Sequence, residues 1–366
     1  MIVRRRSFLF AVFAALVAAS FAAPSYAQSF DHKGLARLVL ENHIRPGYDR
    51  LLASARAFGD EAKVFCDAAP GEPTDALKDA FRDLVLSWAR IEQVQFGPVM
   101  DERRHARVFY WPDRKGLGRR QVRRTLAKKD ARSLDPAALA ERSVALQGLG
   151  AAEILLYAKG AKEFATPGPA RDFRCGYLKT IAANIVNIAA EVQSAWNDEN
   201  GYVRTFLSPG ADNPSYLDDS EVTLEIAKAF LVGLERLRDI EIAGPLGLSR
   251  KTSRRTRAAF KPSGLSTRFL IAKLEGMTML YVAGGLGDRI DAHEWGMGSS
   301  ILSELNLALN HMKSLNVLMG EVAENEEAEN RLLASGFPLK NAREQTSRIL
   351  ADAAGLSLGF NALDGD

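Results

Sequence analysis

Charged and aromatic residues gather in one stretch of the first half of the chain. Glu92 follows Trp88 by one helical turn, and a segment containing His105, Arg107 and Asp113 comes shortly after. An acid beside arginines and indoles suits a buried ion-pair network, or alternatively a pocket for a metal ion or a small anion. The residue types favour the structural network and leave the pocket open.

Motifs of several common enzyme classes are missing from the sequence. The pair His293-Glu294 is followed by Trp295, Gly296 and Met297, so the second histidine of a His-Glu-x-x-His zinc site is absent. The sequence also has no P-loop and no dinucleotide-binding glycine fingerprint. These absences exclude an ordinary zinc peptidase of that type and the common nucleotide-binding enzymes.

The elements that must position these residues are predicted to be helices. Apolar residues recur mostly at steps of three and four in the clearest stripe, which comprises Tyr177, Leu178, Ile181, Ile185, Ile188, Val192 and Trp196. Similar patterns predict helices over 33–58, 75–96, 137–158, 218–242, 266–281, 299–322 and 340–354. Pro209, Gly210 and Pro214 mark a boundary, so we expect an all-α fold of two packed helical bundles, 28–205 and 216–366.

The N-terminus has the pattern of a cleavable signal peptide over residues 1–27. Three arginines precede an apolar run over 8–23, and Ser25-Tyr26-Ala27 fits a signal-peptidase site. The run is shorter than a membrane span, although a retained anchor is the alternative. We expect a periplasmic protein exported by the Sec or the twin-arginine route, and not a lipoprotein, because no cysteine lies near the cleavage site.

Charge is balanced overall but uneven along the chain. The 366 residues include 48 Lys and Arg against 45 Asp and Glu, and the signal peptide holds three arginines and no acid, so 45 of each remain. This balance argues against nucleic acid as a partner. The basic span around Arg119, Arg120, Arg123 and Arg124 predicts a solvated surface, or alternatively a peripheral contact with anionic lipid or an acidic partner.

Two cysteines, Cys66 and Cys175, are the only thiols. An even pair in an oxidising compartment predicts a disulfide that closes a loop of about 110 residues, with two free buried thiols as the alternative. Two thiols cannot build a four-thiolate zinc site.

Blocks spread over nearly the whole mature chain resemble the imelysin-like family. They are Trp88-x3-Glu92-x3-Phe96-Gly97-Pro98, Phe109-Tyr110-Trp111-Pro112-Asp113, Gln147-Gly148-Leu149 with Glu153, Arg174-Cys175, Ser263-Gly264-Leu265-Ser266, Leu274-Glu275-Gly276, and the terminal segment 359–366 with Asn361 and Asp364. The resemblance implies two helical bundles related by internal duplication and export from the cytoplasm. It also implies a link to iron uptake, and the family is associated with insulin-cleaving metallopeptidase activity.

The family's proposed metal motif, Gly-x-His-x-x-Glu, is altered in this chain. Gly150 stands where the resemblance implies the histidine, and Glu153 is retained. His105 is a possible substitute ligand, with oxygens from Glu92, Asp113 and Glu153, so the cofactor is unknown and a divalent metal or iron is possible.

Three functions are therefore expected in order. The first is a non-enzymatic periplasmic binding or accessory protein, linked to iron or other metal acquisition, whose site uses Glu92, Arg107, Asp113 and Glu153. The second is a metallopeptidase, which the loss of the histidine at Gly150 weakens. The third is an interaction scaffold that docks an acidic partner or the membrane surface.

Overall fold

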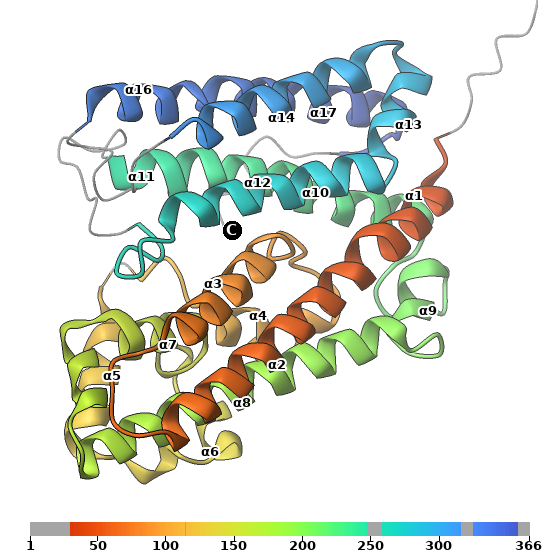
Figure 1. Cartoon of the computed structure of the whole chain (residues 1–366). Coiled ribbons are helices and arrows are strands. Elements are labelled where there is room, and N and C mark those ends of the chain that lie inside the picture. The colour runs from red at the N-terminus through yellow and green to blue at the C-terminus, as the bar shows by residue number, and fades with distance from the viewer. Residues whose placement is uncertain (1–29, 114, 247–257, 316–324, 358–366) are drawn as a thin grey trace, which may run out of the picture.

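The computed structural model describes residues 30–113, 115–246, 258–315 and 325–357. The predicted signal peptide over 1–27 and the terminal residues Asn361 and Asp364 lie outside these ranges. Every regular element in the described ranges is helical, which confirms the predicted all-α class. Figure 1 shows the helices arranged in two layers, with the first half of the chain in one and most of the second half in the other.

A long N-terminal rod and two partners form the centre of the first half. The rod consists of α1 (His32–Val39), a π-helical turn (Leu40–Ile44) and α2 (Arg45–Asp67). Helix α2 packs along α8 (Pro169–Asn197) and α3 (Asp75–Ala89). All seven residues of the predicted apolar stripe are buried on α8, because their spacing places them on inward-facing parts of the helix.

Short helices cover one end of this half: α4 (Arg104–Val108), α5 (Leu117–Lys128), α6 (Pro136–Ala140) and α7 (Gly148–Tyr157). Single 3-10 turns separate them, at Gly97–Val99, Asp101–Arg103, Ala131–Ser133, Val144–Leu146 and Lys159–Ala165. The predicted helix over 137–158 is wrong, because Gln147 is extended and Gly148 has a φ of +72°. The predicted helix over 75–96 ends earlier, at Ala89.

The second half is a bundle built mainly from α10 (Asp219–Arg236), α12 (Ser266–Ala283), α14 (Met297–Lys313) and α17 (Gly336–Ala353). Smaller elements complete it: α9 (Tyr202–Leu207), a π-helical turn (Leu237–Ile242), α11 (Ala243–Leu246), α13 (Leu286–His293) and α16 (Glu326–Ala334). The predicted helix over 299–322 ends at Lys313, and positions 316–322 lie outside the described residues.

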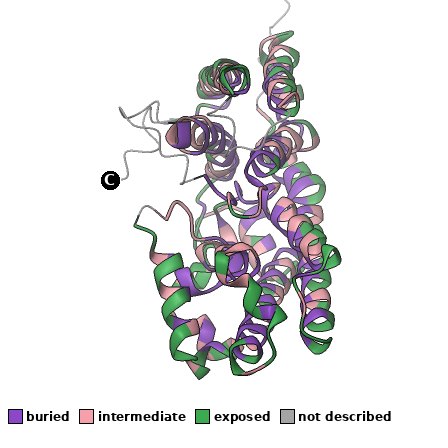
Figure 2. Ribbon diagram, turned by 60° about the vertical axis from the view of Figure 1, so that its left-hand side comes forward, coloured by how far each residue is buried: buried purple, intermediate pink, exposed green. Residues whose placement is uncertain are grey.

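The two halves share one hydrophobic core. Helix α1 packs on α10, and α3 packs on α12, so segments far apart in sequence meet at the junction. Buried side chains from both halves belong to a single cluster, and Figure 2 shows buried residues on the helices of both layers. The junction is therefore a dry, packed surface that carries its own polar groups.

A disulfide joins Cys66 at the end of α2 to Cys175 in α8, as the sequence predicts. Their Cα atoms are 5.4 Å apart, within the usual range for a bridged pair. None of the described helices alone is long and apolar enough to span a membrane, although α12 and α13, bent by 55°, pass that test as a pair.

Candidate functional site

A buried lysine holds two carboxylates together at the junction of the halves. Lys273 Nζ in α12 lies 2.5 Å from Oε1 of Glu92, just beyond α3, and 2.5 Å from Oε1 of Glu241, in the π-helical turn after α10. All three side chains are only 2% exposed. We call Lys273, Glu92 and Glu241 the junction triad. Its ammonium occupies the place between the acids where a bound cation would otherwise be attracted.

Three further side chains surround the junction triad. Arg236 Nε lies 3.2 Å from Glu241 Oε1, and its Nη2 donates to the backbone oxygen of Trp111 at 3.2 Å. His105 Nε2 lies 3.0 Å from the backbone oxygen of Glu92, and its ring packs 5.0 Å from the ring of Trp88. The predicted residues Glu92, His105 and Trp88 therefore do meet in one cluster.

Burial and neighbouring charges divide the protonation states of this cluster. Burial opposes ionisation of Glu92, but the charges of Lys273 and Arg236 outweigh it and lower the pKa of Glu92. Burial raises the pKa of Glu241, and the charge of Glu92 adds to that effect. Burial also lowers the pKa of His105, which favours the neutral imidazole.

Glu153 makes a second polar contact across the junction. Its Oε1 accepts hydrogen bonds from Ser263 Oγ at 2.6 Å and from Ser263 N at 3.0 Å, which link α7 to the segment before α12. Burial raises the pKa of Glu153 to about 7, against the opposing effect of the two hydrogen bonds. This carboxyl therefore changes its charge near neutral pH.

Arg107 belongs to a separate network inside the first half. Its Nη2 donates to Asn184 Oδ1 at 3.0 Å and its Nε to Gln147 Oε1 at 3.3 Å. The amide of Gln147 donates in turn to the backbone oxygen of Leu139 at 3.1 Å. The predicted motif residue Gln147 thus ties α6 and α8 to α4.

Asp113 caps a helix and does not face the junction triad. Its Oδ1 accepts from Leu117 N at 2.7 Å, and its Oδ2 accepts from Gly118 N at 2.8 Å, at the first turn of α5. The four residues that the sequence assigned to one ligand site, Glu92, Arg107, Asp113 and Glu153, therefore lie in four different sets of contacts.

The residues present do not fit a resident metal ion. Within the described ranges, no three His, Cys, Asp or Glu side chains are arranged to hold one. In the junction triad, Glu92 Oε2 and Glu241 Oε2 are buried without a hydrogen-bond partner among the described residues. Two oxygens are fewer than metal sites use, and Lys273 repels a further cation.

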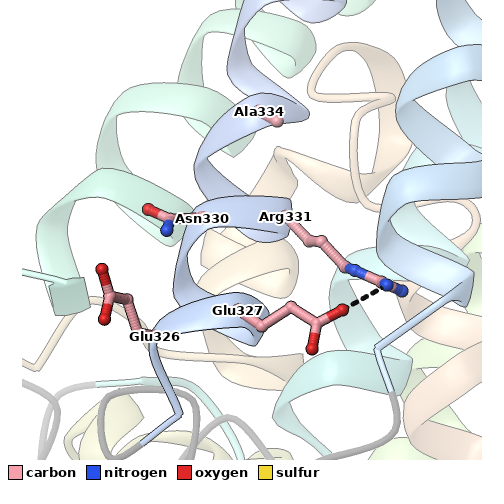
Figure 3. A pocket seen from close by; sticks show the side chains of 5 residues that line it. All are labelled: Glu326, Glu327, Asn330, Arg331 and Ala334. Atoms are coloured by element: carbon pink, nitrogen blue, oxygen red, sulfur yellow. Dashed lines mark hydrogen bonds and ion pairs between the residues drawn. The ribbon is translucent and has the colours of Figure 1, made fainter.

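A shallow open hollow lies elsewhere, on α16. It is lined by Glu326, Glu327, Asn330, Arg331 and Ala334, and Arg331 pairs with Glu327 across it. Figure 3 shows these side chains along one helix. They are exposed or half-buried apart from their own ion pair, so the hollow does not provide the enclosure of a ligand site.

Sequence reasoning missed Lys273, Glu241, Arg236 and Ser263. Only Ser263 had a signal, since it belongs to a block that resembles the family. The sequence also contains Gly355-Leu356-Ser357-Leu358-Gly359, which has the spacing of a nucleophile elbow. Ser357 follows the helix α17 and not a strand, so the structural context of that motif is missing.

Comparisons with known proteins agree with this architecture. The family model described as imelysin, peptidase M75, matches residues 44–348. An imelysin-like protein from Psychrobacter arcticum 273-4 superposes with a TM-score of 0.74 at 20% identity, covering 90% of this chain and 97% of that one. A putative iron-regulated protein A precursor from Parabacteroides distasonis ATCC 8503 gives 0.71 at 12% identity, with coverage of 87% and 94%.

No curated protein matches the sequence. The two solved structures share the fold, and the family model covers most of the chain. The chain belongs to the imelysin family.

Proposed function

We propose that this chain is an exported, non-enzymatic accessory protein of iron or other metal acquisition, which holds no metal of its own in the family's motif. The observation that carries the proposal is the commitment of its buried acids to donors of the same chain. Glu92 and Glu241 bind Lys273, and Glu153 binds Ser263.

The altered motif supports the non-enzymatic part. The histidine position is Gly150 on α7, and a side chain there would meet open space within 4 Å. No neighbouring group has therefore taken the place of an imidazole. The link to iron is supported by family membership and by a structural neighbour that is named as iron-regulated. Export is supported by the signal-peptide pattern and by that neighbour's description as a precursor.

Growth under metal limitation tests the physiological role. A strain that lacks the chain should grow normally in replete medium and poorly when iron is chelated, and the wild-type gene should restore growth. The Glu153→Gln variant should also restore it, because an accessory protein needs the folded scaffold and not the acid's chemistry. A growth defect that no metal supplement relieves would contradict the role in acquisition.

Hydrolysis is the second candidate, and one observation favours it. Glu153 is a buried acid with a pKa of about 7, and its carboxylate contacts the Ser263 hydroxyl, as a general base contacts a nucleophile. Peptidase activity that disappears in both Glu153→Gln and Ser263→Ala, while both variants stay folded, would establish this candidate. Metal-dependent hydrolysis would in addition be abolished by chelators and restored by added metal.

The restored motif separates the two candidates further. Gly150→His rebuilds the family's spacing next to Glu153, at a position with room for the side chain. We expect no gain of metal affinity or peptidase activity, because Glu153 stays bound to Ser263 and no third ligand is arranged beside it among the described residues. A gain of either would show that the histidine alone was missing.

A further inference from the structure

Helix α5 carries a dense basic face that no ion pair neutralises. Its buried positions are Gly118, Val122 and Thr125, which turn toward the first half of the chain. The exposed positions on the other side are Arg119, Arg120, Arg123, Arg124 and Lys128. We call these five residues the α5 basic face. Figure 1 shows α5 at the edge of the first half.

The surroundings leave these charges free to meet a partner. None of the ion pairs between described residues involves a member of the α5 basic face, and the helix itself contains no acid. The nearest acid in sequence on its C-terminal side, Asp130, is already paired with Arg132 and Arg142. The mature chain has no net charge, so this concentration of cations is local and sets the orientation of any approach to an anion.

The composition of the face favours a phosphate surface over a protein partner. Protein interfaces depend on buried aromatic or aliphatic anchors. The exposed positions of α5 hold four arginines, one lysine and Ala127, with no apolar residue larger than alanine. Guanidinium groups match phosphate oxygens with paired hydrogen bonds. The helix is about 18 Å long, which lets several headgroups be contacted at once.

We propose that the α5 basic face docks the protein on a membrane surface rich in anionic phospholipid headgroups. The contact is peripheral and electrostatic, since the face has no apolar side chain to insert. It rests on the proposed export only in placing the chain beside a membrane, and it is independent of metal acquisition.

Sedimentation with lipid vesicles tests the proposal with the purified mature chain. Wild-type protein should bind vesicles that contain phosphatidylglycerol, should ignore pure phosphatidylcholine vesicles, and should be released by added salt. The patch variant combines Arg119→Gln, Arg120→Gln, Arg123→Gln and Arg124→Gln, which keeps good helix formers on α5. Its partition coefficient should fall at least about 100-fold, since each basic residue near an anionic surface contributes a factor of roughly five.

A matched control removes four exposed cations from elsewhere. The control variant combines Arg37→Gln, Arg56→Gln, Lys63→Gln and Lys162→Gln, none of which forms an ion pair with a described residue. It has the same net charge as the patch variant, and it should bind the anionic vesicles nearly as well as wild type. The proposal is overturned if both variants lose binding equally, if neither loses it, or if wild type binds neither vesicle at low salt. Circular dichroism confirms that each variant is folded.

Discussion

At the scale of single residues, the acids at the junction are explained by their partners. A buried carboxylate is costly unless it is paired, and Lys273 serves two of them at once. The sequence predicted a polar cluster around Glu92 from nearby residues. It could not predict Lys273 or Glu241, because these come from positions more than 140 residues away and carry no motif. Only the packing of α3 against α12 brings them together.

Removing the shared cation should destabilise the fold strongly. Lys273→Met leaves Glu92 and Glu241 buried without it, and we expect a loss of about 3–5 kcal/mol in the free energy of unfolding. Urea denaturation measures this loss. The triple variant that adds Glu92→Gln and Glu241→Gln should recover most of it, because no uncompensated charge remains buried.

A surface lysine provides the comparison for that variant. Lys228 pairs with Glu225 in the same half of the chain, but its side chain is 52% exposed. Lys228→Met should cost less than about 1 kcal/mol. If Lys273→Met costs no more than Lys228→Met, the junction triad does not hold the halves together.

The buried carboxyl of Glu153 should make stability depend on pH. Its pKa is about 7 in the folded chain and near 4.5 when exposed. Between these values the folded state binds the proton and the unfolded state does not, so stability falls as pH rises from about 4.5 to about 7. The loss attributable to Glu153 is about 3 kcal/mol and is complete above that range.

Glu153→Gln should remove this dependence and keep both hydrogen bonds from Ser263, since its amide oxygen also accepts. Urea denaturation over the same pH range should show the variant to be the more stable protein above about pH 7. Parallel pH profiles of the two proteins would mean that Glu153 does not titrate in this range.

At the scale of elements, long regular helices were predictable and their interruptions were not. The stripe on α8 was found because its spacing repeats over several turns. The break at Gly148 was missed because an apolar pattern continues across it. There the backbone passes so close to α4 that a Cβ on Gly148 would lie 2.3 Å from the backbone oxygens of Arg107 and Val108.

Two glycines on α7 should therefore respond in opposite ways to alanine. Gly148→Ala meets both a positive φ and the α4 backbone, and should lower stability by about 2 kcal/mol or more. Gly150→Ala meets no atom within 4 Å and should be neutral, or stabilising by up to about 1 kcal/mol. Thermal or urea unfolding of both variants checks this contrast. Equal effects would contradict the close approach of α7 to α4.

The disulfide between α2 and α8 should contribute to stability through the loop that it closes. Cys66 and Cys175 are 109 residues apart in sequence, and a bridge over such a loop contributes about 4 kcal/mol by the chain-entropy model. The Cys66→Ala/Cys175→Ala variant should lose that amount in urea denaturation, and reduced wild type should match it. A wild-type protein with two free thiols in a non-reducing assay would contradict the bridge.

At the scale of the whole molecule, two helical layers share one core, and their polar contacts are satisfied mainly within the chain. The fold class followed from periodicity, but the candidate site did not, because sequence blocks indicate which residues matter without saying what they contact. Glu153 and Asp113 both come from such blocks. One binds Ser263 across the junction, and the other caps α5.

The metal content of the mature protein tests the central claim most directly. Protein purified from its native compartment would be analysed by elemental mass spectrometry, beside Glu92→Gln and Glu153→Gln variants prepared in the same way. We predict no stoichiometric metal in any sample, because the acids are bound to Lys273 and Ser263. About one metal ion per chain in wild type, lost in either variant, would contradict the claim.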